Sequence, residues 1–258
     1  MSWSGRELIA VFSLLATGAL GCAHAASNGP VRAEGRAAEA FSAVTVRGLV
    51  DVQVTVGVAP KVEVRCAQAL VPRVHTRVER GTLVVATDLP DDASTEGCMV
   101  VVKTPTLVAL RTSSVGDVIV NGDAVGLATI ESDGVGDVRI DSVRADSCTI
   151  KSSGVGDVAI GRLDATSVSV TATGTGDVKL AGRAARVSIV EEGTGEVDTR
   201  ALAALRGDVE VTGTGEVHLH ATEHADVKSS GVGDVHVSGQ PSDRRAKTSG
   251  PGKVHWDR

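Results

Sequence analysis

The sequence is poor in aromatic residues, in positive charge and in long apolar runs. Its 258 residues include two Phe, two Trp and no Tyr, and the formal net charge is −6. Proteins that bind single-stranded nucleic acid combine basic grooves with aromatic stacking platforms, so nucleic acid is not expected as a partner. The shortage of rings also disfavours soluble sugars as ligands. What is abundant is glycine, with 30 residues, and the aliphatic residues that suit half-buried strands.

The apolar run near the N-terminus is typical of an export signal, which we expect to occupy residues 1–25. Leu8–Leu20 has 13 mostly apolar residues, too few to span a bilayer as a stable helix. Ala19–Cys22 resembles the lipobox of bacterial lipoproteins and predicts lipidation of Cys22, although Ala first and Leu second depart from the usual pattern. Ala23–Ala25 is an alternative signal peptidase site. We favour lipidation, and in either case expect export to the cell envelope (periplasm or outer membrane), with a lipid anchor as the only membrane contact.

Three cysteines remain after the signal. Export would place them in an oxidising compartment, where disulfides persist. Cys66 and Cys98 both lie in the less regular N-terminal third and are a candidate disulfide pair. Cys148 occupies a position where other repeats carry Val168 and Val187, so we expect it to be a buried small hydrophobic residue.

A five-residue motif, Gly-x-Gly-acid-Val, recurs through the second half of the chain. The first copy, Ser114–Val118, lacks the leading glycine, and the last, Gly250–Val254, has lysine in the acidic place. A period near twenty residues is typical of a solenoid, in which each repeat packs only against its neighbours. Propellers need about forty residues per blade and leucine-rich repeats need their own Leu and Asn pattern, so neither fits. The second glycines stand at 116, 136, 156, 176, 195, 215, 233 and 252.

Each repeat predicts two short strands separated by turns. Apolar residues alternate with polar ones, as in strands with one buried face. The Ser/Thr-Gly-x-Gly stretch is expected to turn through glycines with positive φ. Stacked repeats would pair in parallel about 4.8 Å apart, so the sequence predicts an all-β, single-stranded parallel β-helix with rungs of about 20 residues. Two inward columns follow, Val118, Val138, Val158, Val178, Val197, Val217, Val235 and Val254, and Leu110, Ile130, Ile150, Val170, Ile189, Val209, Val227 and Ala246.

The β-helix is expected over residues 38–258, after a short linker at 26–37. Residues 41–110 alternate like strands but lack the regular motif, so less regular rungs are expected there. Gly48–Val52 is a worn copy of the motif without its second glycine. The open ends of a solenoid need covers, because unpaired strand edges recruit other chains. Trp256 takes an inward place in the last repeat and is expected to plug that end.

Several stretches occur in an order that resembles a known family. They are Phe41–Val56, Gly81–Val85, Thr104–Leu107 and the Ser-Gly-x-Gly-Asp-Val rungs, and together they cover about residues 38–255. This order is similar to that of the auto-transporter adhesin head GIN domain family of bacterial exported proteins. The resemblance implies a β-helical exported protein, with "adhesin" as a family label rather than an assigned activity. It implies no catalytic residues.

An acidic residue follows the second glycine of nearly every repeat. Stacked carboxylates at rung spacing repel by roughly 1 kcal/mol in water, so their charge must be offset. We expect each to accept hydrogen bonds from N–H groups of its own turn. The alternative is Ca2+ held between rungs by Asp137, Asp157 and Asp177, and no other cofactor is expected. The column is Asp117, Asp137, Asp157, Asp177, Glu196, Glu216 and Asp234.

Three positions after the second glycine, the last three repeats carry His218, His236 and His255. Earlier repeats have other residue types there, so the fold does not require histidine. Three imidazoles at rung spacing could bind Zn2+ or Cu2+, or gather charge near pH 6. We favour the alternative, a solvated histidine-rich end, because zinc sites usually use convergent rather than columnar ligands.

Catalysis is not indicated. The repeats have no long insertions that would build a cleft, and the glycine turns lack the sequence context of a phosphate loop. We therefore predict a non-enzymatic exported β-helix that acts as a surface or periplasmic binding, adhesion or scaffold module, and contacts a cell-envelope component or protein. The alternative is a cation-stabilised polysaccharide-associated protein, and a carbohydrate-active enzyme is less favoured still.

Overall fold

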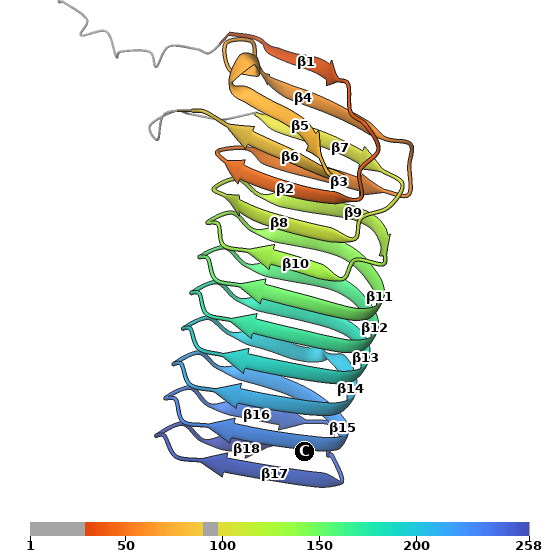
Figure 1. Cartoon of the computed structure of the whole chain (residues 1–258). Coiled ribbons are helices and arrows are strands. Elements are labelled where there is room, and N and C mark those ends of the chain that lie inside the picture. Colours follow the sequence, from red (N-terminus) through yellow and green to blue (C-terminus); the bar gives the residue numbers. More distant parts are fainter. Residues whose placement is uncertain (1–28, 90–97, 258) are drawn as a thin grey trace, which may run out of the picture.

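The protein folds into a rod of stacked β-coils. The computed structural model describes residues 29–89 and 98–257. Its 18 strands belong to one sheet that winds round the rod axis, and Figure 1 shows the coils stacked from the N-terminal strands to the C-terminal ones. None of the described residues forms a helix long and apolar enough to cross a bilayer. The predicted all-β solenoid is confirmed, whereas the signal segment with Cys22 lies outside the described residues.

The regular part of the rod runs from β8 to β18. Its long strands bend round a corner, and each pairs in parallel with the strand one repeat further along the chain. In the pair β11–β12, for example, Val138 lies opposite Val158 and Ile150 lies opposite Val170. The strands are β8 Ala109–Ser114, β9 Val118–Val125, β10 Thr129–Ser132, β11 Val138–Ser152, β12 Val158–Ala172, β13 Val178–Glu191, β14 Val197–Val211, β15 Val217–Ser229, β16 Val235–Ser238, β17 Asp243–Thr248 and β18 Val254–Trp256.

Aligned aliphatic side chains fill the inside of the coil. The motif valines from Val118 to Val235 are all buried and lie in register from rung to rung, as predicted. Burial of one such side chain is worth about 1.5–3 kcal/mol, so these columns dominate the stability of the rod. Cys148 is buried and unpaired in the column of Val168 and Val187, also as predicted.

The N-terminal strands cap the rod and stack out of sequence order. The rung β2–β3 lies between the rungs β6–β7 and β8–β9. Beyond it, β4 and β5 run antiparallel to β7 and β6, and β1 runs antiparallel to β4. The irregular rungs therefore differ from the others in order and direction, because antiparallel strands cover this end of the sheet. Their bounds are β1 Val31–Arg36, β2 Ala43–Gly48, β3 Asp51–Val56, β4 Lys61–Ala67, the 3-10 turn η1 Val71–Arg73, β5 Val74–Glu79, β6 Thr82–Thr87 and β7 Met99–Thr104.

Strand β1 lies within the stretch predicted as a linker, residues 26–37. Its backbone pairs with β4 along its whole length, and Arg36 Nη2 donates a hydrogen bond to the carbonyl of Val71 at 3.2 Å. The linker prediction is corrected here. All but one of the β1 side chains are exposed and none forms an apolar face, so the sequence contained no strand signal.

The C-terminal end is covered less completely. All six residues of β17 are exposed, including Ala246, which was predicted to face inward. It is exposed because β17 is the last strand on its side of the coil and, among the described residues, no further rung packs over it. Trp256 is half-buried in the inward column, and the Arg244 guanidinium lies 5.4 Å from its ring centroid.

Candidate functional site

The motif turns form one face of the rod, and close stacking requires their glycines. Both glycines of one rung lie against the backbone of the rung before it. A Cβ atom on Gly134 would overlap the carbonyl oxygen of Ser114, and one on Gly156 would overlap that of Gly136. The glycines of the regular motif copies do not have positive φ, so that prediction was wrong, although Gly48 in the worn copy has a φ of 90°. Glycine is needed because neighbouring backbone occupies the place of a side chain.

A linear groove, hereafter the glycine groove, runs along this face across six rungs and encloses about 760 Å³. Gly134, Gly154, Gly174, Gly193, Gly213 and Gly231 line its length. The residues after them are Val135, Val155, Thr175, Thr194, Thr214 and Val232, whose valines are more than half exposed. The residues before them are Asp133, Ser153, Thr173, Glu192, Thr212 and Ser230. The groove thus has one polar border and one border of valine and threonine.

The aspartates of the acid column bond to the next rung. The backbone N–H of Asp157 donates to Asp137 Oδ1 at 2.9 Å, and that of Asp177 donates to Asp157 Oδ1 at 2.9 Å. This aspartate ladder begins at Asp51, in the worn motif copy, which receives the N–H of Asp117 from 66 residues away. The prediction of bonds within each residue's own turn is corrected, because the N–H that faces each carboxylate belongs to the following coil.

Basic side chains offset the remaining charge of the ladder. Arg139 Nη2 donates to Asp137 Oδ2 at 2.6 Å, and Lys179 Nζ donates to Asp177 Oδ2 at 3.2 Å. The bond to Asp177 raises the pKa of Lys179. One carboxylate oxygen thus takes a backbone N–H while the other faces a cation. Calcium held by Asp137, Asp157 and Asp177 stays a prediction.

The ladder changes at the C-terminal rungs, where glutamate replaces aspartate. Among the described residues, no backbone N–H bonds to the side chain of Glu196 or Glu216. Glu196 Oε1 lies 3.2 Å from Arg200 Nη2 and 3.4 Å from His218 Nε2. Glu216 Oε1 lies 3.0 Å from His218 Nε2 and 3.3 Å from His236 Nε2. The acid column therefore turns toward the histidine column in these rungs.

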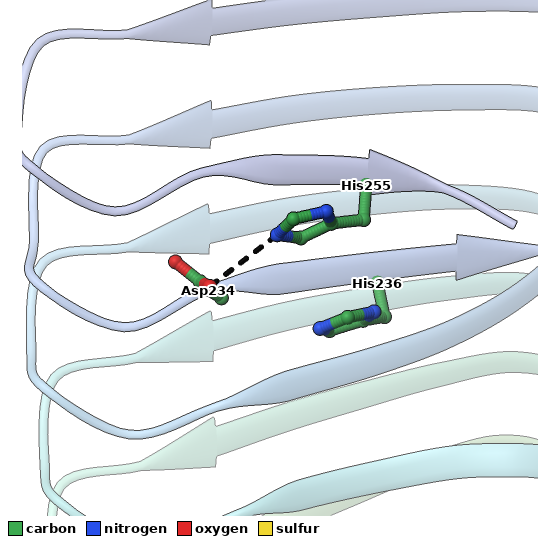
Figure 2. Close-up of side chains that lie close together, drawn as sticks. All are labelled: Asp234, His236 and His255. Atoms are coloured by element: carbon green, nitrogen blue, oxygen red, sulfur yellow. Dashed lines mark hydrogen bonds and ion pairs between the residues drawn. The ribbon is translucent and has the colours of Figure 1, made fainter.

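The histidine column is a stack of rings. The ring centroids of His218 and His236 are 4.9 Å apart, and those of His236 and His255 are 4.5 Å apart. Figure 2 shows Asp234 beside the last two rings, with its Oδ2 atom 3.3 Å from His255 Nε2. The N–H of Lys253 and the His255 ring hold the pKa of Asp234 below its usual value.

Asp234, His236 and His255 can each offer one ligand atom, and these three atoms lie within 4.8 Å of one another. The structure thus brings two of the three predicted histidines together, whereas His218 lies outside that set. Asp234 was assigned to the acid column only. Its role beside the rings was missed because the sequence shows which residues share a column, but not how close two columns come.

Sequence analysis also missed Glu191, a buried carboxyl in the last position of β13. It has no exposed surface and stands where neighbouring rungs carry Ala172 and Val211. Burial raises its pKa from the usual value of 4.5 to about 7, against the opposing effect of the N–H groups of Gly193, Gly215 and Gly213. Neither carboxylate oxygen makes a hydrogen bond of normal geometry with a described residue. The sequence could have indicated this buried carboxyl, because a charged residue stands in a column whose neighbouring members are small or apolar.

The cysteines divide into a pair and a buried thiol. Cys66, in β4, and Cys98, just before β7, form a disulfide with a Cα–Cα distance of 4.1 Å. The bond ties β4 to the start of β7 in the N-terminal cap. Cys148 lies in the core, where burial raises the pKa of its thiol to about 11. An unreactive, protonated thiol follows from that environment.

Solved structures share this fold at low sequence identity. A putative adhesin from Parabacteroides distasonis is 21% identical, with 89% of this chain and 98% of that chain covered and a TM-score of 0.81. A putative adhesin from Bacteroides fragilis is 21% identical, with 88% and 96% covered and a TM-score of 0.69. A putative lipid binding protein from P. distasonis is 19% identical, with 88% and 98% covered and a TM-score of 0.69. Likeness at this level of identity shows the fold alone.

No curated protein matches this sequence. Residues 40–241 match the family described as "Putative auto-transporter adhesin, head GIN domain", in agreement with the resemblance found in the sequence. That stretch includes the N-terminal rungs, the aspartate ladder and the whole glycine groove. The chain therefore belongs to the auto-transporter adhesin head GIN domain family.

Proposed function

We propose that this protein is an exported, non-enzymatic binding module of the cell envelope, tethered by a lipid on Cys22. Membership of an adhesin family supports a role at the cell surface. The lipobox-like Ala19–Cys22 supports the anchor. The partner is an envelope component or protein that lies along the side of the rod.

The glycine groove carries this proposal. It crosses six rungs, has a glycine at every step, and has valine or threonine along one border. A small molecule is better held by a pocket with a few convergent polar groups, whereas a groove with a regular repeat suits an extended polymer. Its exposed valines and threonines offer flat, stiff side chains that lose little rotamer freedom on binding.

The hydrogen bonds, ion pairs and burial of the acidic residues support a role other than catalysis. The ladder aspartates already use one oxygen on a backbone N–H and, at Asp137 and Asp177, the other on a basic side chain. Glu191 has the raised pKa expected of a general acid, but it has no exposed surface on which a substrate could bind. General acid catalysis requires a carboxyl within hydrogen-bond reach of the substrate.

The binding surface can be tested by changing one exposed aliphatic residue on each of two faces. Val155→Lys places a charge in the glycine groove, and Leu205→Lys places one on a different, alanine-lined depression. Immobilised protein is exposed to solubilised envelope extract, and the retained material is analysed. We expect Val155→Lys to abolish retention and Leu205→Lys to leave it intact. The opposite pattern, or equal retention by both variants, overturns the assignment to the groove.

The anchor is tested separately by labelling cells with palmitate. The label is expected on the wild-type protein and should be lost in Cys22→Ala. An unlabelled wild type would mean that the alternative cleavage site is used, and a labelled Cys22→Ala variant would mean that another residue carries the lipid.

The second candidate is a cation-stabilised, polysaccharide-associated protein. The polar border of the groove favours it, because the hydroxyls of Ser153, Thr173, Thr212 and Ser230, interrupted only by Glu192, suit the hydroxyls of an extended glycan. Repeating the retention experiment with excess chelator separates the candidates. Loss of retained polysaccharide on chelation supports this candidate, and unchanged retention supports the cation-independent module.

A further inference from the structure

The outward column changes its residue type near the C-terminal end of the rod. His218, His236 and His255 occupy consecutive rungs in one pairing register. The earlier rungs carry unrelated side chains at the same position, so the fold does not require histidine there. Those earlier residues are Ile119, Arg139, Ala159, Lys179 and Asp198.

The ring nitrogens of the last two histidines face carboxylates. His236 Nε2 lies 3.3 Å from Glu216 Oε1, and its Nδ1 lies 3.5 Å from Asp257 Oδ2. His255 Nε2 lies 3.3 Å from Asp234 Oδ2 (Figure 2). At His236, Asp257 beside Nδ1 is the usual surrounding of a metal ligand, because a carboxylate on one ring nitrogen fixes the tautomer and aims the other nitrogen at the ion. At His255, Asp234 is itself close enough to share an ion with the ring.

The carboxylates of this patch lack the permanent counterions found upstream. Asp137 and Asp177 pair with arginine and lysine. For Glu216 and Asp234, by contrast, the only cationic groups within 4 Å among the described residues are histidine rings. Unlike arginine and lysine, an unprotonated imidazole carries no charge but does offer a lone pair. A divalent cation placed here would offset both carboxylates and use those lone pairs.

From this geometry we infer that Asp234, His236 and His255 bind a Zn2+-class ion, with Glu216 as the nearest fourth ligand. Tetrahedral zinc with bonds of about 2.0–2.1 Å holds its ligand atoms about 3.3 Å apart. The three present ligand atoms lie within 4.8 Å of one another. Binding would therefore require these partly exposed side chains to rotate toward one another.

The donor set selects the class of metal. Two imidazole nitrogens with carboxylate oxygens suit Zn2+ and Cu2+, whereas Ca2+ prefers six to eight oxygens. The side chains of Asp234 and His255 are 42% and 41% exposed, so one side of the ion would remain open to water or to a ligand from a partner. We therefore expect an exchangeable ion and not a buried structural one. This inference does not depend on the glycine groove.

The test is Zn2+ titration of the full chain in detergent, without a histidine tag, followed by calorimetry. We expect one Zn2+ per chain, with affinity reduced at least about tenfold in His236→Asn and in His255→Asn. Glu216→Gln should weaken binding by a smaller factor. His224→Asn is the matched control, because His224 lies outside the column although its Nδ1 lies 2.9 Å from Asp243 Oδ2. It should bind Zn2+ as the wild type does.

Two further measurements distinguish loss of the metal site from poor folding of a variant. Co2+ in place of Zn2+ should give the visible absorption of a tetrahedral site in the wild type, and Ca2+ in excess should not displace it. Thermal unfolding without metal should be the same in His224→Asn and His255→Asn. Absence of one-to-one Zn2+ binding by the wild type, or equal affinity in the wild type, His236→Asn and His255→Asn, overturns the site.

Discussion

The middle rungs and the C-terminal rungs share one backbone but differ in the chemistry of their outer columns. In β11–β13, aspartates bond to the N–H of the next rung, and arginine or lysine stands beside two of them. From β14 to β18, glutamates replace two of these aspartates, and histidines line the adjacent column. The inward valine column continues through both regions unchanged.

This difference separates what the fold requires from what it permits. Stacking requires glycine in the turn and aliphatic residues inside, so these positions hardly vary along the rod. The outward positions meet only their neighbours above and below, as in other solenoids. A change of residue type that persists over three rungs therefore points to a local role, and the uniform motif does not.

The largest loss of stability is expected from replacing the turn glycines, which both regions require for close stacking of their backbones. Gly156→Ala places a Cβ atom against the carbonyl of Gly136, and Gly233→Ala places one against that of Gly215. Each should destabilise the rod by about 3 kcal/mol, because stacked backbone cannot move aside. Gly35→Ala in β1 is the control, since its Cβ would meet no heavy atom within 4 Å. Chemical denaturation measures the difference, and a much milder Gly233→Ala would mean that the C-terminal rungs stack less tightly.

Glu191, at the border between the two regions, should make stability depend on pH. Its pKa is raised from 4.5 in the usual case to about 7 in the fold, so the folded state holds its proton more tightly than the unfolded state does. The contribution of Glu191 to stability is therefore greatest below pH 4.5, falls as the pH rises from 4.5 to 7, and is lost above 7. The loss is roughly 3 kcal/mol, since one pKa unit corresponds to about 1.4 kcal/mol.

Glu191→Gln should remove this dependence and be the more stable protein at pH 8. Unfolding is measured at pH 4 and pH 8 for both chains, with Glu192→Gln, in the exposed turn, as the control. A difference in stability between wild type and Glu191→Gln that is the same at pH 4 and pH 8 would show that the carboxylate is solvated in the fold.

The sequence was sufficient to predict the rungs because the same glycine and valine positions recur about every twenty residues. It also located the outer columns, since residues one repeat apart must stack. It could not predict the stacking order of β2–β3, because the chain returns to that rung after passing through β4 to β7. Strand β1 lacked any alternation that could have revealed it.

The candidate sites were less predictable for a geometric reason. Column membership follows from sequence spacing, so His218, His236 and His255 could be placed together. The distance between two columns depends on how the coil bends, and this decides that Asp234 faces His255. The hydrogen-bond partners of the aspartate ladder could not be predicted from sequence spacing either, because the N–H groups that bind the carboxylates belong to the next rung.

A smaller effect should distinguish the acid columns of the two regions. Asp157→Ala removes the acceptor for the N–H of Asp177 and should cost about 1 kcal/mol. Asp157→Asn keeps an oxygen in the same place and should cost less. Glu216→Ala should change stability by less than about 0.5 kcal/mol in the absence of metal, because the Glu216 side chain is itself 48% exposed and accepts no backbone N–H from a described residue. Equal losses for Asp157→Ala and Glu216→Ala, measured by chemical denaturation, would show that the N–H bonds contribute nothing to the ladder.

The smallest effect is expected from calcium in the middle rungs. A Ca2+ ion between Asp137, Asp157 and Asp177 would compete with backbone N–H groups for one oxygen of each carboxylate, and with Arg139 or Lys179 for another. Millimolar Ca2+ should therefore shift the unfolding temperature by less than about 1 °C relative to excess chelator, because only a ligand that binds the folded state stabilises it. Differential scanning calorimetry measures the shift. A rise of several degrees that disappears in Asp157→Asn would establish calcium between the rungs, and the aspartate ladder would then be an ion site and not only a set of hydrogen bonds.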